Sequence, residues 1–66
     1  MKHGYGIYDW PDGKRFEGYW CKGFQHGEGK LIFPDKSIQI GTWKLGVLSK
    51  LKRQIDSRGI EKIFSE

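Results

Sequence analysis

The chain has 66 residues, a formal net charge of +4, one cysteine and two histidines. So short a chain builds only a small core, and a single cysteine cannot form an internal disulfide to support it. The residues also lack the soft ligands of a closed zinc site, so we expect no metal, no cofactor and stabilisation by a partner. A lone thiol fits a reducing compartment, and the expected location is the cytoplasm.

The first expected element is a strand over residues 4–10. In its sequence, Gly-Tyr-Gly-Ile-Tyr-Asp-Trp, the even positions carry two glycines, Tyr8 and Trp10. Alternate residues of a strand share one face, so this face carries glycines and aromatic rings. The Pro-Asp-Gly at 11–13 that follows is a turn sequence.

The second expected strand covers residues 16–20 and shows the same alternation, with Phe16, Gly18 and Trp20 at even positions. The next loop is expected at residues 21–25. Two short strands around a Pro-Asp-Gly turn are typical of a β-hairpin.

The sequence then repeats itself at a distance of 23 positions without a gap. Tyr8 and Trp10 become Leu31 and Phe33, so size and apolar character are kept where identity is not. A repeat of this kind predicts an all-β protein, an elongated single-layer antiparallel β-meander of repeated hairpins. The identical pairs at this spacing are His3 and His26, Gly4 and Gly27, Gly6 and Gly29, Pro11 and Pro34, Asp12 and Asp35, Gly18 and Gly41, Trp20 and Trp43, and Gly23 and Gly46.

The recurring glycines predict close contact between bare backbone and large rings. Glycine weakens an isolated strand, but an aromatic ring on the neighbouring strand can lie flat over it. We expect the rings of Phe16, Trp20 and Trp43 to lie across Gly4, Gly6, Gly27 and Gly29. The full set expected to be structural is Gly4, Gly6, Gly18, Gly23, Gly27, Gly29, Gly41 and Gly46.

A single sheet has no second layer, so part of its aromatic face must stay open, and a large open apolar patch indicates an interaction site. Aromatic side chains make good interface anchors because they have few rotatable bonds. The expected partner-binding residues are Tyr8, Trp10, Phe16, Trp20, Leu31, Phe33 and Trp43.

The run FEGYWCKGFQHGEG at 16–29, followed by Pro-Asp at 34–35, resembles the MORN repeat. That repeat reads roughly Tyr-x-Gly-x-Trp-x-x-Gly-x-x-His-Gly-x-Gly, followed by a turn. Phe16 and Gln39 stand where the family usually has tyrosine, and Lys36 replaces the turn glycine. After Gly46 the His-Gly-x-Gly element is lost, so we expect the array of repeats to stop or be capped near residue 48.

The resemblance implies an elongated, twisted single-layer sheet that acts as an interaction module. Such arrays scaffold assemblies at cytoskeletal and ciliary structures, or lie beside membranes, and often hold a helix or a peptide in the groove of the sheet. The expected function is therefore a non-catalytic scaffold or adaptor subunit of a larger assembly.

The C-terminal residues 49–66 are expected to form a basic cap or docking tail, separate from the hairpin repeats of residues 1–48. A helix would place Leu48, Leu51 and Ile55 on one face, and propensity favours it slightly. Alternatively, Gly59 lies two periods after Gly13, so the tail can be a degenerate third hairpin with a turn there.

The alternative function is peripheral binding to anionic phospholipids or to an acidic partner through the tail. The residues expected to make that contact are Lys50, Lys52, Arg53 and Arg58. Nucleic-acid binding is disfavoured because the lysines are spread out rather than aligned along one groove. An enzyme is also disfavoured, because His3 and His26 occupy a repeat position and no base is arranged beside Cys21.

Overall fold

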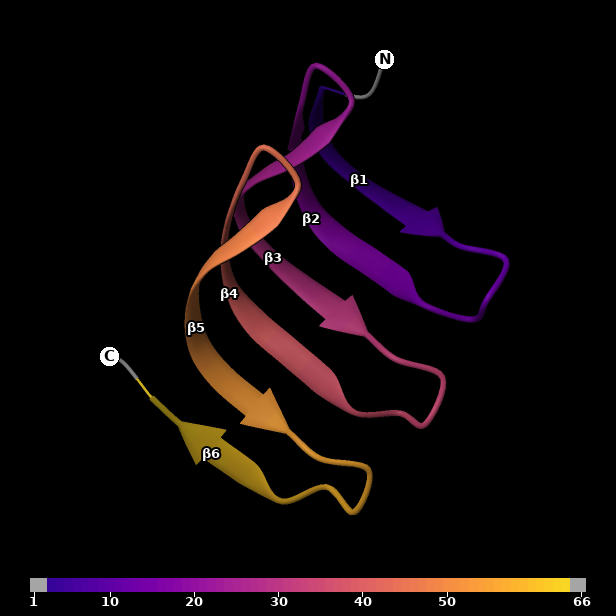
Figure 1. Ribbon diagram of the computed structural model, residues 1–66, viewed down its shortest axis with the longest axis vertical. Helices are drawn as coiled ribbons and strands as arrows, with labels where there is room; N and C mark the ends of the chain where they lie inside the picture. The colour runs from indigo at the N-terminus through magenta and orange to yellow at the C-terminus, as the bar shows by residue number, and fades with distance from the viewer. Residues whose placement is uncertain (1–2, 65–66) are drawn as a thin grey trace.

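The computed structural model describes residues 3–64, which form one antiparallel sheet in which each strand pairs with the next along the chain (Figure 1). The expected all-β meander is confirmed. The six strands are β1 (Gly4–Asp9), β2 (Arg15–Cys21), β3 (Phe24–Ile32), β4 (Ile38–Lys44), β5 (Val47–Ile55) and β6 (Glu61–Ile63).

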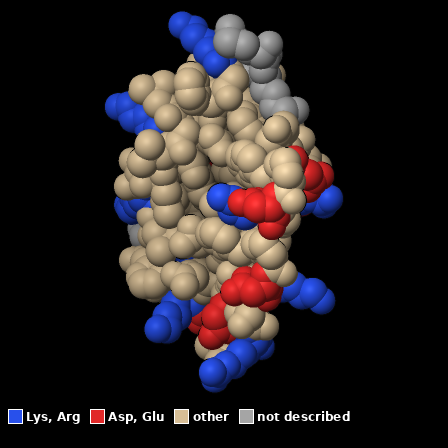
Figure 2. Space-filling view, turned by 45° about the vertical axis from the view of Figure 1, so that its right-hand side comes forward, with Lys and Arg blue, Asp and Glu red and all other residues tan. Residues whose placement is uncertain are grey.

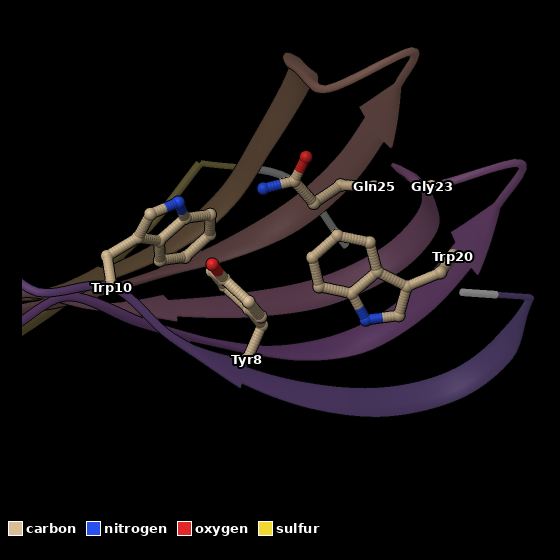
Figure 3. A pocket seen from close by; sticks show the side chains of 5 residues that line it. All are labelled: Tyr8, Trp10, Trp20, Gly23 and Gln25. Carbon is tan, nitrogen blue, oxygen red and sulfur yellow. The ribbon is translucent and has the colours of Figure 1, made fainter. Parts of the chain in front are cut away.

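The strand register lines up the repeated glycines. Gly6 pairs with Gly18, Gly18 with Gly29, and Gly29 with Gly41, so a row of glycines crosses four neighbouring strands. The 23-residue period produces this row, because each repeat contributes one complete hairpin to the sheet. The sheet bends, and the face that carries Tyr8, Trp10 and Trp20 is concave (Figure 3).

A small aromatic core lies on this concave face. Phe16 is 0% exposed, and its ring meets Trp43 and Trp20 edge to face, with centroids 4.9 and 5.3 Å apart. Trp43 and Trp20 are 3% and 7% exposed, and Leu31 and Leu48 pack against the cluster. Since aromatic pairs in this geometry stabilise beyond the area they bury, three rings hold together a sheet that has no second layer.

The expected contact between rings and glycines is confirmed at two positions. A Cβ atom on Gly29 would lie 2.7 Å from Cε1 of Phe16, so this ring occupies the space where a side chain would stand. The indole Nε1 of Trp20 donates a hydrogen bond to the carbonyl oxygen of Gly6 at 3.1 Å. Trp20 also pairs with Gly4 in the register, as Trp43 does with Gly27.

The turns at one end of the sheet are capped by aspartate. The Asp12 carboxylate accepts from the Lys14 N–H at 3.1 Å, and the Asp35 carboxylate from the Ser37 N–H at 2.9 Å. The third turn, between β5 and β6, uses Asp56 for the same purpose. A side chain that satisfies nearby backbone donors fixes the turn and hence the register of its hairpin.

The turns at the other end have two residues each, Lys22-Gly23 and Leu45-Gly46, with positive φ at every position. Such turns match the twist of paired strands but favour asparagine and glycine, since a left-handed backbone strains most other residues. Leu45, at φ 52°, carries this strain while its side chain is 63% exposed.

Leu45→Asn is therefore expected to stabilise the protein by about 1 kcal/mol, because asparagine adopts the left-handed conformation more readily. For a domain of this size that corresponds to a rise in Tm of about 4–8 °C in a thermal melt followed by circular dichroism. Lys44→Asn, in the neighbouring strand position, is the control and should not raise Tm. An unchanged Tm for Leu45→Asn would show that contacts of the leucine offset its backbone strain.

The helix favoured for the tail is wrong, and the alternative hairpin is correct. β5 pairs with β4 from Lys44↔Val47 to Ile38↔Ile55, and β6 returns along β5 from Ile55↔Glu61 to Arg53↔Ile63. The reason is the edge of β4, whose open hydrogen-bonding groups favour a strand over a slight helical propensity. Because β5 runs through position 48, the sheet continues from the hairpins into the tail. Within residues 3–64 there is no helix long and apolar enough to cross a membrane.

Candidate functional site: an aromatic groove on the concave face

A cavity of about 430 Å³ opens on the concave face beside β1 and β2 (Figure 3). We call it the aromatic groove, and its lining residues are Tyr8, Trp10, Trp20, Gly23 and Gln25. Three strands and two turns build it. Tyr8 is in β1, Trp10 follows β1 and Trp20 is in β2. Gly23 lies in the β2–β3 turn, and Gln25 lies near the start of β3.

The three rings of the groove stand edge to face in a row. The centroids of Tyr8 and Trp10 are 5.0 Å apart at 80°, and those of Tyr8 and Trp20 are 6.2 Å apart at 71°. Trp20 is fixed from below by its hydrogen bond to Gly6 and by Phe16 of the core. Because neighbouring rings are nearly perpendicular, they form apolar slots rather than a flat surface.

Polar groups surround these rings at the open side. Figure 3 shows the Tyr8 hydroxyl and the Trp10 indole nitrogen pointing away from the ribbon, toward the side on which Gln25 extends its amide. Within residues 3–64, these three groups form no side-chain hydrogen bond. The groove therefore combines apolar slots with available hydrogen-bond donors, the usual composition of a binding site.

A basic side chain lies at one end of the groove, and a second lysine is in the turn at the other end. The Lys14 ammonium is 5.8 Å from the centroid of the Trp10 ring and 3.5 Å from Asp12 Oδ2. Lys22 is exposed in the turn beside Gly23. In the β3–β4 turn, hydrogen bonds from Ser37 lower the pKa of Asp35 below its usual value, so that carboxylate keeps its charge as a turn cap.

The seven residues predicted to contact a partner divide into two groups. Phe16, Trp20 and Trp43 are buried core residues, and Trp20 alone of them also lines the groove. The members with accessible surface are Tyr8, at 42% exposure, and the half-buried Trp10, Leu31 and Phe33. Contact of all seven with a partner stays a prediction.

The sequence interpretation missed Gln25 as a groove residue. It lies in β3 just past the Lys22-Gly23 turn, and the register shift between β2 and β3 comes further along the hairpin, between Trp20 and Gly18. Its pairing with Trp20 in the register explains why it reaches the groove. The only indication in the sequence was that a two-residue turn at Lys22-Gly23 would place Gln25 opposite Trp20.

The structural glycines occupy two kinds of position. Gly41 and Gly29 lie where neighbouring atoms leave no space for a side chain, and Gly46 completes a two-residue turn at φ 84°. The others follow these patterns along the sheet: Gly6 and Gly18 belong to the glycine row, and Gly4, Gly23 and Gly27 have positive φ.

The basic tail residues do not form a free positive cluster. The Lys52 ammonium is 3.4 Å from Glu28 Oε1, and Arg53 Nη1 is 3.5 Å from Glu61 Oε2. Lys50 and Arg58 take part in no ion pair among residues 3–64. In Figure 2, Lys and Arg side chains project from the outline of the molecule, and most of the surface between them is uncharged.

Within residues 3–64 there is no group of three His, Cys, Asp or Glu side chains that could hold a metal ion. Cys21 is a free, half-buried thiol, and His26 is exposed in β3. The aromatic groove offers apolar contacts and hydrogen bonds for recognition.

A single-layer sheet of repeated hairpins with an aromatic groove defines an open β-repeat protein. The family described as MORN repeat matches residues 1–15 and 16–38, and the chain belongs to this family. MORN repeats are generally non-catalytic modules for protein interaction or membrane binding.

Longer proteins carry similar sequence. Alsin from Homo sapiens and Alsin from Mus musculus are each 37% identical over 49 residues, which cover 67% of this chain and 3% of the relative. The ALS2 C-terminal-like protein from Homo sapiens is 43% identical over 35 residues, or 53% of this chain and 4% of that protein. The chain therefore spans only a few per cent of the length of these curated relatives.

Proposed function

We propose that the chain is a non-catalytic protein-interaction module, a small scaffold or adaptor subunit of a larger cytoplasmic assembly of the cytoskeletal or ciliary kind. It binds a helix or a peptide of another subunit on its concave face. The observation that carries this proposal is the aromatic groove, where Tyr8 and Trp10 remain accessible beside a core that already holds the sheet together.

The physical argument is that accessible rings on a fixed support bind at low entropic cost. Tyr8 and Trp10 are held by edge-to-face contacts, so little rotamer freedom remains to be lost on binding. Burying such a ring against a partner gives the kind of contact that dominates protein interfaces.

Peripheral binding to anionic lipid is the other function open to the family, and the tail gives it little support. Glu28 and Glu61 each neutralise one of the basic residues expected to contact lipid. An attraction of about 1 kcal/mol per basic residue near an anionic surface is correspondingly reduced.

The two functions are separated by cross-linking mass spectrometry on the tagged protein purified gently from its own cells. Lys14 lies beside the groove, whereas Lys30 pairs with Glu17 on the opposite face, so they report on different surfaces. We expect stoichiometric partner subunits with cross-links at Lys14 rather than Lys30. Tyr8→Ala should reduce partner recovery about tenfold, the effect of losing one interface anchor.

The matched control is Tyr5→Ala. Tyr5 is in the same strand as Tyr8 but on the opposite face and is 65% exposed. Among residues 3–64 its one ring contact is with Tyr19. Equal recovery losses for both variants would contradict the assignment of the groove. Retention of the protein on membranes only at low salt, with no partner subunit, would support the lipid function instead.

A further inference from the structure

The position of the groove restricts the kind of chain that can enter it. Its walls are side chains on the face of the sheet, and the backbone of β2 is already paired with β1 and β3. A segment lying there cannot add a strand to β2. The backbone polar groups of such a segment must form hydrogen bonds within the segment, as in an α-helix, or with donors outside it, as in polyproline II.

The groove has the donors that the second kind of chain needs. The Tyr8 hydroxyl, the Trp10 indole N–H and the Gln25 amide point to the open side (Figure 3). Carbonyl groups in the middle of an α-helix are already bonded within the helix, so these donors would find few acceptors there. The carbonyls of polyproline II have no internal partner and can accept from all three.

The spacing of the rings points the same way. The three centroids are separated by 5.0 and 6.2 Å, so the row is no longer than the sum of these two distances. One turn of polyproline II takes three residues and about 9 Å, which fits such a row, and proline rings fill apolar slots between aromatic side chains. A helix about 10–12 Å across would touch the same row with a single turn.

The charges at the groove indicate the sequence around the prolines. Lys14 lies over Trp10 at one end, where it also pairs with Asp12 at 3.5 Å. The turn at the other end carries Lys22, which is exposed and takes part in no ion pair among residues 3–64. The ammonium of Lys14 already lies near the face of Trp10, which disfavours a basic ligand there. Acidic residues beside a proline run would complement Lys22, the lysine without an ion pair among residues 3–64.

We infer that the aromatic groove binds a proline-rich segment in the polyproline II conformation, flanked by acidic residues. The inference rests on the proposed protein-interaction function and names the class of partner. Tyr8 and Trp10 form the slots for proline rings, and the three donors fix the direction of the bound segment.

The test is a titration of the 66-residue chain with two synthetic peptides, followed by tryptophan fluorescence and calorimetry. The first peptide has a run of about eight prolines between pairs of glutamates. The second has the same glutamates around an amphipathic helix with leucines at i, i+3, i+4 and i+7. We expect 1:1 binding of the proline peptide only, about tenfold weaker with Tyr8→Ala and unchanged with Tyr5→Ala.

A third peptide tests the charges, with glutamines in place of the glutamates. It should bind about threefold more weakly at low salt, the effect of a surface ion pair, and the difference should shrink as salt is added. Equal binding of the glutamine and glutamate peptides would overturn the acidic part of the inference. Circular dichroism of each variant confirms that the sheet is intact.

Other results would overturn the inference in distinguishable ways. Binding of the helical peptide alone, with the same loss in Tyr8→Ala, removes the proline assignment and leaves the proposed function standing. Equal losses in Tyr8→Ala and Tyr5→Ala remove the groove as the site. Failure of both peptides, with salt-sensitive binding to vesicles of anionic phospholipid, removes the inference and the proposed function together.

Discussion

Phe16→Ala is expected to unfold the chain under conditions in which the native protein is folded. Among residues 3–64, Phe16 is the one core residue with no exposed surface, and both Trp20 and Trp43 pack against it. Replacing a buried phenylalanine by alanine costs about 3–5 kcal/mol. A domain of this size has only a few kcal/mol of stability, so the loss is comparable to the whole.

The measurement is urea unfolding followed by circular dichroism and tryptophan fluorescence. Tyr19→Ala is the control, because Tyr19 belongs to the same strand, lies on the opposite face and is half exposed. It should lower the free energy of unfolding by about 1 kcal/mol or less. A folded Phe16→Ala variant with near-native stability would show that the three rings are not the main support of the sheet.

Gly41→Ala is expected to be comparably damaging for a different reason. A methyl group on Gly41 would collide with the carbonyl oxygen of Lys50 and lie 3.2 Å from Cα of Leu51. Both atoms belong to the backbone of β5, which cannot rotate away as a side chain can. The β4–β5 pairing would have to separate locally, and we expect a loss of about 3 kcal/mol or more, the upper range for overpacking.

Gly59→Ala gives the matched comparison in the β5–β6 turn. Gly59 has a φ of 86°, but a Cβ atom there would meet nothing within 4 Å. Its replacement carries only the cost of a left-handed alanine, about 1–2 kcal/mol. Equal losses for Gly41→Ala and Gly59→Ala, measured by urea unfolding, would contradict the role of close strand approach at Gly41.

Trp20 belongs to both the aromatic core and the aromatic groove, so a substitution there changes folding and binding together. Trp20 contacts Phe16 on one side and Tyr8 on the other. Truncating Trp20 would therefore remove both stability and a wall of the groove. Tyr8 lies on the accessible side of this row, and for this reason it separates binding from folding better than the buried rings do.

The tail shows why local propensity failed. Leu48, Leu51 and Ile55 can be placed on one face of a helix, but they also lie on a strand. The choice depends on the edge of β4, the preceding strand, which offers β5 hydrogen-bond partners along its length that a helical propensity does not take into account. The period of the repeat carried the correct information, because Gly59 does form the third turn at the position equivalent to Gly13.

The sequence also predicted only part of the aromatic groove. Alternation placed Tyr8, Trp10, Phe16 and Trp20 on one face, and this followed from the two-residue period of a strand. Which rings are covered depends on sheet curvature and cross-strand neighbours, so the burial of Phe16 beside Trp43 could not be read from the sequence. Gln25 reaches the groove because the two-residue turn pairs it with Trp20, and this pairing is set only when β2 and β3 come together.

The sequence by itself determined the hairpin period, the glycine and aromatic face, and the turns at Asp12 and Asp35, because these depend on local spacing and backbone preference. The tertiary structure alone decided that the tail is a hairpin, that Glu28 and Glu61 neutralise Lys52 and Arg53, and that an accessible groove remains beside Tyr8. Those features depend on contacts between side chains of different strands, whose distances are set only when the strands pair and the sheet bends.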